Sequence, residues 1–303
     1  MHADEVDTDS ALVGRLLAEQ FPQWADLTIE PVLPMGTDNA LYRFGDDMVA
    51  RLPRTERTGR RLEKVRLWLP RLGSSLPLAV PVQLAEGAPA EGYPFAWSVY
   101  TWLKGENATF ERIADLSQLA TDLAQFVADL QGIDPAGGPT PGEHNFFRGV
   151  PLAARDQSTR ASIAALAGAI DVEATTAAWE AALHAPVWER PPVWIHGDLD
   201  SRNLLAEEGR VSAVIDWDGL GVGDPACDVM VVWKMLSADT RGIFRSALSI
   251  DDATWARSRG WALSQAVNAL SYYTPETNAV LVSESQRWLA EVLADLSSDD
   301  GYP

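Results

Sequence analysis

Two kinds of hydrophobic pattern divide the chain near residue 103. Between residues 27 and 103, short apolar runs separated by turn residues predict β-strands. The expected strands cover 27–33, 40–44, 48–52, 77–85 and 95–103. A basic stretch from Thr55 to Leu72 lies among them and has its apolar residues at helical spacing. We therefore expect a small antiparallel sheet with one packed helix, and a further helix ahead of it that Ser10 could cap.

Helical periodicity dominates the rest of the chain. The predicted helices cover 113–131, 159–184, 226–248, 252–273 and 281–296, and 132–150 is a Pro- and Gly-rich loop. One β segment, which includes residues 193–215, interrupts them. The pattern predicts an α+β protein of two lobes: an N-terminal antiparallel sheet lobe over residues 1–103 and a larger, mainly helical C-terminal lobe over residues 104–303.

The chain is acidic, with 43 Asp and Glu residues against 24 Lys and Arg residues and a net charge of −19. Such a charge repels nucleic acid and anionic lipid, so neither is an expected partner. It also attracts cations, which leaves two interpretations open. The charge can serve solubility alone, or it can belong to a cleft that concentrates a polycationic substrate.

Features that direct a chain out of the cytoplasm are not expected. The first ten residues are acidic and contain no apolar run, so no signal peptide is predicted. No uncharged apolar stretch approaches the ~20 residues of a membrane helix. Cys227 is the only cysteine, which excludes an internal disulfide. We therefore predict a cytoplasmic protein, and we make no prediction of its oligomeric state.

The segment "IHGDLDSRNLL" (195–205) concentrates polar residues between two apolar runs. A short strand follows it, then a turn at 207–210 and a returning strand at 211–215 that ends beside Asp216. Such a hairpin would make Asp198, Asn203 and Asp216 converge. They would supply one base candidate and two oxygen ligands of the kind Mg²⁺ prefers. A capped turn, with its aspartates bonded to backbone amides, is the alternative that spacing leaves open.

The pattern HGDxxxxN at 196–203, followed by a strand and "IDWDG" at 215–219, closely resembles the aminoglycoside phosphotransferase family. These are small-molecule kinases related to protein kinases. The segment "GLGVGDPACDV" (219–229) is also typical of the family, and agreement extends from about Leu33 to Leu296. The resemblance implies a protein-kinase-like fold and ATP or GTP as phosphoryl donor, together with Mg²⁺.

The resemblance also implies roles for single residues of the loop. Asp198 would accept or orient the proton of the attacking hydroxyl, and Asn203 and Asp216 would hold Mg²⁺ against the nucleotide phosphates. His196 would support the loop rather than carry a proton. We read Asp224 as supporting, and with it Asp228, through bonds to the backbone near the loop.

The N-terminal lobe carries the residues that the resemblance assigns to the nucleotide. "LPMGTDNALYRF" (33–44) matches the family's nucleotide loop and places Gly36 and Thr37 against phosphate. In "VARLP" (49–53), Arg51 occupies the position of the phosphate-pairing lysine of kinases. "YTWLKGE" (100–106) matches the link between lobes, where backbone groups of Thr101 and Leu103 would hold adenine.

One departure from the family concerns the helix after Arg51. Related sequences carry a glutamate there that pairs with the basic residue, and the best register places Val65 at that position. Glu63 lies about 200° around the helix from Val65. Either Glu63 or Glu56 substitutes by local rearrangement, or Arg51 works without a carboxylate.

The acceptor is the least specified part of the prediction. Asp200, Asp218 and Glu276 could face a cationic acceptor, although surface carboxylates are the simpler interpretation. The leading hypothesis is an antibiotic-resistance kinase that phosphorylates a hydroxyl of an aminoglycoside-like molecule. A metabolic kinase for a sugar, amino alcohol or macrolide is the first alternative. A nucleotide-binding protein with little transfer activity, suggested by Val65, is the second.

Overall fold

The computed structural model describes residues 5–33 and 38–299, which divide into two compact units. Unit 1 comprises the described residues of Met1–Gly105 together with Ala213–Asp218, and unit 2 comprises those of Glu106–Ser212 and Gly219–Pro303. Unit 1 is built on a sheet and unit 2 is mostly helical, so the α+β fold class predicted from the sequence is confirmed.

Unit 1 contains a five-stranded antiparallel sheet in the order β1-β2-β3-β5-β4. The strands are β1 (Ile29–Pro31), β2 (Asn39–Phe44), β3 (Met48–Pro53), β4 (Gln83–Gly87) and β5 (Trp97–Thr101). β3 is central and pairs with both neighbours, with Arg51 opposite Leu41 on β2 and Ser98 on β5. Arg51 is thus held on two sides by the ladder.

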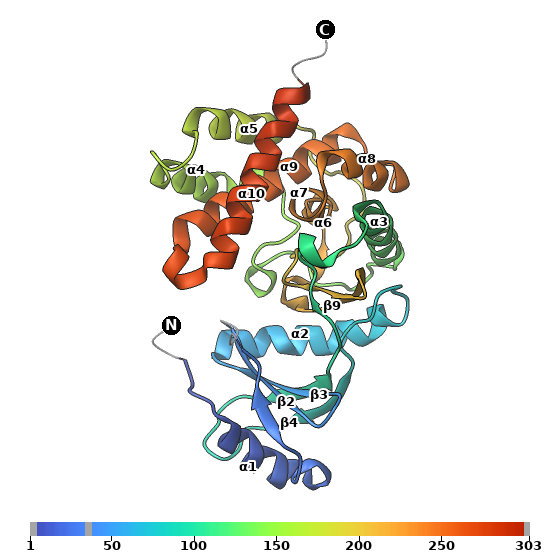
Figure 1. Ribbon diagram of the computed structural model, residues 1–303, viewed down its shortest axis with the longest axis vertical. Helices are drawn as coiled ribbons and strands as arrows, with labels where there is room; N and C mark the ends of the chain where they lie inside the picture. The colour runs from blue at the N-terminus through green and yellow to red at the C-terminus, as the bar shows by residue number, and fades with distance from the viewer. Residues whose placement is uncertain (1–4, 34–37, 300–303) are drawn as a thin grey trace. The chain divides into compact units, whose positions relative to one another are not determined.

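Two helices, α1 (Ser10–Gln20) and α2 (Glu56–Gly73), lie on opposite sides of this sheet (Figure 1). The apolar face of α1 packs into one core with Ala50 and Leu52 of β3. Because side chains alternate along a strand, Arg51 projects from the other face of the sheet. The N-cap of α1 is Asp9, which accepts from the Leu12 N–H at 2.7 Å. The expectation that Ser10 caps this helix is therefore wrong by one residue.

Unit 2 packs its helices around α9, which contacts α4, α5, α6 and α10. The helices are α3 (Leu116–Gly132), α4 (Asp156–Ala165), α5 (Val172–His184), α6 (Ala226–Val229), α7 (Val231–Met235), α8 (Ala238–Ala247), α9 (Asp252–Tyr272) and α10 (Pro275–Asp299). The single helices predicted over 159–184 and 226–248 are corrected to two and three helices. Gly168, with φ +86°, lies between α4 and α5, and Leu236 is extended before α8 begins.

Short strands frame the motif at 196–203. β7 (Val193–Ile195) pairs antiparallel with β10 (Gly221–Gly223). β6 (Glu106–Asn107), β8 (Leu204–Glu207) and β9 (Arg210–Val214) form a second small sheet. The chain from Ala213 to Asp218 belongs to unit 1, where Ala213 bridges to Ala79. Within the described ranges, no helix combines the length and apolarity that a bilayer crossing requires.

Candidate active site

The motif loop of unit 2 is fixed at its start by a buried carboxylate. Asp228 accepts the backbone N–H groups of His196 and Gly197, both at 2.7 Å. Gly197 has φ +86°, and a Cβ there would lie 2.6 Å from the carbonyl oxygen of Gly219. Glycine is therefore required at this point of the loop. Asp228 therefore forms two hydrogen bonds with the backbone, as expected from the sequence.

His196 is completely buried below the loop. Its Nδ1 accepts the backbone N–H of Asp198 at 3.2 Å, so in this arrangement Nδ1 carries no proton. Asp224 lies further along and forms a buried ion pair with Arg257 at 2.7 Å, while it also accepts the N–H of Ala226. The supporting roles of His196 and Asp224 stay predictions.

Asp198 is surrounded by cations. Its Oδ1 lies 3.1 Å from Nη2 of Arg148 and 3.9 Å from Nζ of Lys234, and its Oδ2 lies 3.9 Å from Nη2 of Arg202. Burial opposes ionisation of Asp198, but Arg148, Lys234 and Arg202 outweigh it and lower the pKa of the carboxyl well below its ordinary value. Asp198 is an ionised acceptor at neutral pH.

Asn203 ties the end of the loop to Asp198. Its Nδ2 donates to the backbone carbonyl of Asp198 at 2.8 Å and lies 3.4 Å from Oδ2 of the same residue. The side-chain oxygen of Asn203 is the atom that could ligate a metal ion. Asp198 and Asn203 are thus brought together within unit 2.

Arg51 in unit 1 has two carboxylate neighbours. Its Nη2 lies 2.7 Å from Oδ1 of Asp218 and 3.7 Å from Oδ1 of Asp216. Burial disfavours the charge of Arg51, but Asp218 and Asp216 more than compensate and raise its pKa. Lys64 of α2 donates from Nζ to the backbone carbonyl of Asp218 at 2.8 Å. Burial lowers the pKa of Lys64 to about 8.

The carboxylate that pairs with Arg51 therefore comes from the segment after β9 and not from α2. Val65 is buried, with 1% of its surface exposed, whereas Glu63 and Glu56 are exposed. Both alternatives from the sequence analysis are wrong, because Arg51 is paired and its partner is Asp218. The link from β3 to α2 runs through Asp218, whose carboxylate binds Arg51 and whose carbonyl binds Lys64.

Asp216 adopts a backbone conformation that is rare for a residue with a side chain. Its φ is +57°, and 53% of its side chain is exposed. A strained, exposed carboxylate next to buried residues such as Trp217 is typical of a functional position. Its oxygens suit Mg²⁺, as does the amide oxygen of Asn203 in unit 2. The convergence of Asp198, Asn203 and Asp216 involves both units and stays a prediction.

Protein ligands for a metal ion are sparse. Among the residues that the structure describes, no group of three or more His, Cys, Asp or Glu side chains could hold a metal ion. Mg²⁺ at nucleotide sites uses one or two carboxylates and completes its shell with water and phosphate oxygens. Asp216 in unit 1 and Asn203 in unit 2 each carry an oxygen of the type that such a site uses.

The remaining nucleotide residues are only partly described. Gly36 and Thr37 lie outside the described residues. The N–H of Thr101 donates to Val82 at 2.9 Å, and that of Trp102 donates to Asp47 at 2.6 Å. Thr101 could therefore offer adenine its carbonyl but not its N–H. The roles of Thr101 and Leu103 stay predictions.

Two of the three carboxylates considered for a cationic acceptor are not surface groups. Asp200 is fully buried and Asp218 is 5% exposed, and each is paired with an arginine. The interpretation of these two as solvated is wrong, and only Glu276 is exposed. Asp200 is paired with Arg202, two residues away, whereas Asp218 is paired with Arg51, 167 positions earlier in the chain.

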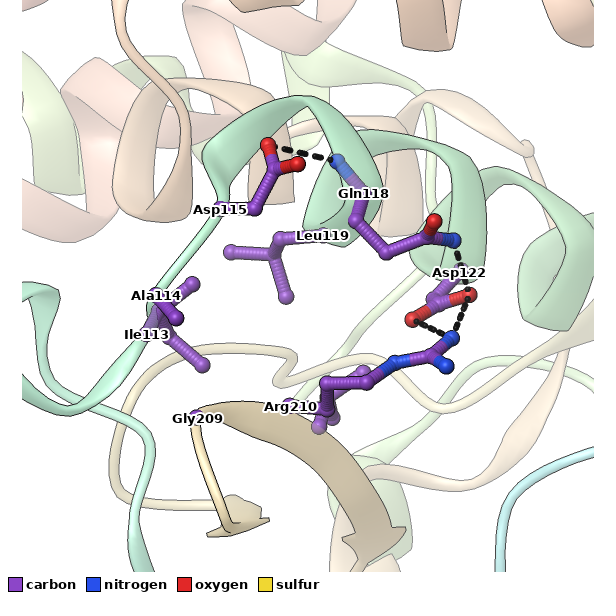
Figure 2. A pocket seen from close by; sticks show the side chains of 9 residues that line it. Ile113, Ala114, Asp115, Gln118, Leu119, Asp122, Gly209 and Arg210 are labelled. Atoms are coloured by element: carbon purple, nitrogen blue, oxygen red, sulfur yellow. Dashed lines mark hydrogen bonds and ion pairs between the residues drawn. The ribbon is translucent and has the colours of Figure 1, made fainter.

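A hollow of about 270 Å³ in unit 2 lies between the start of α3 and the turn of the β8–β9 hairpin (Figure 2). Its polar side chains bind one another or the helix: Asp115 caps α3, and Asp122 accepts from Gln118 and Arg210. These bonds account for the polar residues without a ligand, so the hollow is not a candidate site.

Three cations of the candidate site were not predicted from the sequence: Arg148 and Lys234 next to Asp198, and Lys64 next to Asp218. Lys234 was visible as a single charge inside the apolar run 229–236, which indicates a buried, paired group. Arg148 lies in a Pro- and Gly-rich loop, and no local sequence pattern indicates that it contacts Asp198. Lys64 contacts the backbone carbonyl of Asp218, a partner that helical spacing alone does not indicate.

Comparisons with known proteins find a matching family and similar folds. The model of the family described as "Phosphotransferase enzyme family" matches residues 30–261. No curated protein sequence matches the chain significantly. Among solved structures, the GDP complex of aminoglycoside 2'-phosphotransferase-IIIa is similar with a TM-score of 0.71 and 19% identity, over 95% of this chain and 99% of that one.

Two further solved structures have the same fold. ADP-bound aminoglycoside phosphotransferase APH(2'')-Ib has a TM-score of 0.62 and 17% identity, over 94% of this chain and 99% of that one. Macrolide 2'-phosphotransferase MphH from Brachybacterium faecium has a TM-score of 0.61 and 21% identity, over 94% of this chain and 98% of that one. The kinase-like fold predicted from the sequence is confirmed.

Proposed function

Because the chain belongs to the phosphotransferase enzyme family, we propose that it transfers the γ-phosphoryl group of ATP or GTP to a hydroxyl group of a small molecule. The observation that carries the proposal is Asp198, an ionised carboxylate in a loop held by Asp228 and Asn203. A protein that only bound nucleotide would not need this group. Similar solved structures hold GDP, ADP or ATP, which supports a nucleoside triphosphate as donor.

In the proposed reaction, Asp198 accepts a hydrogen bond from the acceptor hydroxyl and orients its oxygen toward the γ-phosphorus. A bond forms between that oxygen and phosphorus. The bond from phosphorus to the β–γ bridging oxygen breaks, and the nucleoside diphosphate leaves with its electron pair. The hydroxyl proton passes to Asp198 and then to solvent. Positioning and charge neutralisation suffice for this chemistry.

In the proposed reaction, residues of unit 1 contact the phosphate groups of the nucleotide. Arg51 would neutralise phosphate charge, held in place by Asp218. Asp216 and Asn203 would hold Mg²⁺, which when bound neutralises charge on the phosphate oxygens. The acceptor would be an aminoglycoside-like antibiotic, as in several similar structures, or a metabolic sugar, amino alcohol or macrolide. A cytoplasmic location belongs to the same proposal.

The test is consumption of ATP and GTP by the purified protein, with and without Mg²⁺, in the presence of aminoglycosides, macrolides and simple alcohols. The wild type is compared with Asp198→Ala. Transfer that requires Mg²⁺ and falls about 10³-fold in the variant supports the proposal. Nucleotide binding without any transfer to acceptor or water favours the nucleotide-binding alternative.

A further inference from the structure

Next to the loop that carries Asp198, one oxygen of Glu284 has no hydrogen-bond partner among the residues that the structure describes. We propose that Glu284 binds an ammonium group of the acceptor while the acceptor's hydroxyl is bonded to Asp198. This inference rests on the proposed function, because it assigns Asp198 to the hydroxyl. It selects amine-bearing acceptors, such as amino sugars and amino alcohols, over amine-free sugars.

Glu284 lies on the face of α10 that borders the loop. Its Oε1 accepts the hydroxyl of Ser201, which follows Asp198 in the same loop. Trp288 comes four residues later on α10, and the centre of its ring is 4.5 Å from Nζ of Lys234. That nitrogen lies 3.9 Å from Oδ1 of Asp198. Because residues four apart share a helix face, Glu284 and Asp198 border the same part of unit 2.

The hydrogen bonding of Glu284 is incomplete. Its Oε2 is buried and, within the described ranges, accepts no hydrogen bond. Leaving a buried polar atom unbonded costs stability, so such an atom in a native protein indicates a partner that the chain itself does not supply. The residue as a whole is only partly buried, and the terminal torsion of a glutamate is soft, so a ligand can reach the carboxylate.

Glu284 also lacks a direct cation, in contrast to Asp200. Arg202 and Lys234 lie 2.6 and 3.6 Å from Oδ2 of Asp200. Arg287, one turn beyond Glu284 on α10, donates to the backbone carbonyl of Lys234. None of the described side chains forms an ion pair with Glu284. A cation that contacts this carboxylate can therefore come from the acceptor.

An ammonium group suits this carboxylate better than a neutral hydroxyl does. Burial raises the pKa of Glu284 and so disfavours its charged form, and Arg202 and Arg287 offset this effect only in part. A cation beside the carboxylate favours the charged form. Its N–H groups also make charge-assisted hydrogen bonds, which are roughly twice as strong as neutral ones. Glu284 would thus distinguish an amine from a hydroxyl at the same place on the acceptor.

A binding measurement tests the inference without depending on transfer. Kanamycin, which carries several ammonium groups, and maltotriose, a neutral sugar of similar size, are titrated by calorimetry with Mg²⁺ and ADP or GDP present. We expect the wild type to bind kanamycin at least about tenfold more tightly than maltotriose. Glu284→Gln keeps an oxygen for Ser201 but removes the charge, and it should bind kanamycin at least about tenfold more weakly than the wild type.

A control variant separates this contact from the general attraction between a cation and an acidic protein. Glu173→Gln removes the same charge from an exposed position on α5 and should change kanamycin binding less than about twofold. Where kanamycin is phosphorylated, Glu284→Gln should raise its KM at least about tenfold and change kcat less than about threefold. This split is expected of a residue that binds the acceptor without taking part in the chemistry.

Two results would overturn the inference. One is a wild type that binds kanamycin no more tightly than maltotriose, whether or not either is bound. The other is kanamycin binding in Glu284→Gln that equals that of Glu173→Gln. Failure of the proposed function is distinguishable, because it appears as the absence of transfer from ATP and GTP to every acceptor, whereas the calorimetric comparison involves no transfer.

Discussion

At the scale of single residues, the pairing of Arg51 with Asp218 determines whether unit 1 can present a cation to phosphate. The side chains are 13% and 8% exposed, so the pair is shielded from water. Removing one member of a buried pair leaves the other charge uncompensated, which costs about 3–5 kcal/mol. Asp218 also fixes the orientation of the guanidinium.

We predict that Asp218→Asn lowers the free energy of unfolding by about 3 kcal/mol and weakens nucleotide binding about tenfold or more. Urea unfolding and nucleotide titration measure the two effects. Asp46→Asn, in an exposed turn of the same unit, is the control and should change neither. Unchanged nucleotide affinity in Asp218→Asn would contradict the role given to the pair.

Asp228 makes the stability of unit 2 depend on pH. Burial raises the pKa of its carboxyl to about 7, although the N–H groups of Gly197 and His196 oppose this. The folded protein therefore binds a proton more tightly than the unfolded chain, whose carboxyl has its ordinary pKa near 4. The contribution of Asp228 to the free energy of unfolding is fully present below about pH 4. It is lost as the pH rises through about 7.

We predict that the free energy of unfolding of the wild type falls between pH 5 and 7 relative to that of Asp228→Asn. The difference in slope should reach up to about 1.4 kcal/mol per pH unit, which is the limit for one group. Urea unfolding at pH 5, 6, 7 and 8 measures it. Parallel pH profiles for the two proteins would show that Asp228 does not titrate in this range.

The candidate site could be predicted from the sequence where its residues are close in the chain. Asp198 and Asn203 lie five positions apart in one loop, and the structure joins them. The partners of longer range could not be predicted. Arg148 precedes Asp198 by 50 positions, and Asp218 follows Arg51 by 167, so only the folded chain reveals these pairs.

At the scale of elements, α2 shows why a sequence register can mislead. Val65 takes the position at which the family resemblance expects a glutamate, and its side chain is buried. The N-terminus of the helix is set by Thr55, whose Oγ1 accepts the N–H of Thr58 at 3.3 Å. Restoring a glutamate at Val65 would bury a charge while Arg51 already has a carboxylate.

We therefore predict that Val65→Glu destabilises the protein by at least about 2 kcal/mol and does not improve nucleotide binding. Leu67→Glu is the matched control, because Leu67 lies on the same helix and is 54% exposed. It should change stability by less than about 0.5 kcal/mol. Tighter nucleotide binding in Val65→Glu would restore the interpretation that α2 lacks a needed carboxylate.

Most elements could be predicted because their periodicity is local. The strands β1, β2, β3 and β5 and the helices α3 and α9 lie close to their expected bounds, whereas the strand expected over 77–85 is corrected to β4 at Gln83–Gly87. The errors arose where backbone geometry, rather than hydrophobicity, ends an element. The apolar pattern continues through 159–184, but Gly168 takes a positive φ between α4 and α5. The spacing of hydrophobic residues does not indicate the change of chain direction between α4 and α5.

At the scale of the whole molecule, the net charge of −19 does not describe the surroundings of Asp198. The carboxylates closest to it are paired with Arg202 and Lys234. The net charge of the whole sequence therefore does not by itself identify the acceptor. In the proposed reaction, Arg51 of unit 1 neutralises phosphate charge, and Asp198 of unit 2 accepts the proton of the acceptor hydroxyl.

The measurement that tests this account most directly compares phosphoryl transfer and nucleotide affinity in the wild type and Asp198→Asn. The substitution keeps the size of the side chain and removes its charge. We predict that transfer from Mg²⁺-bound ATP or GTP falls about 10³-fold while the Kd for nucleotide changes less than about threefold. Transfer that continues at the wild-type rate in Asp198→Asn would contradict the central claim that this carboxylate orients the acceptor.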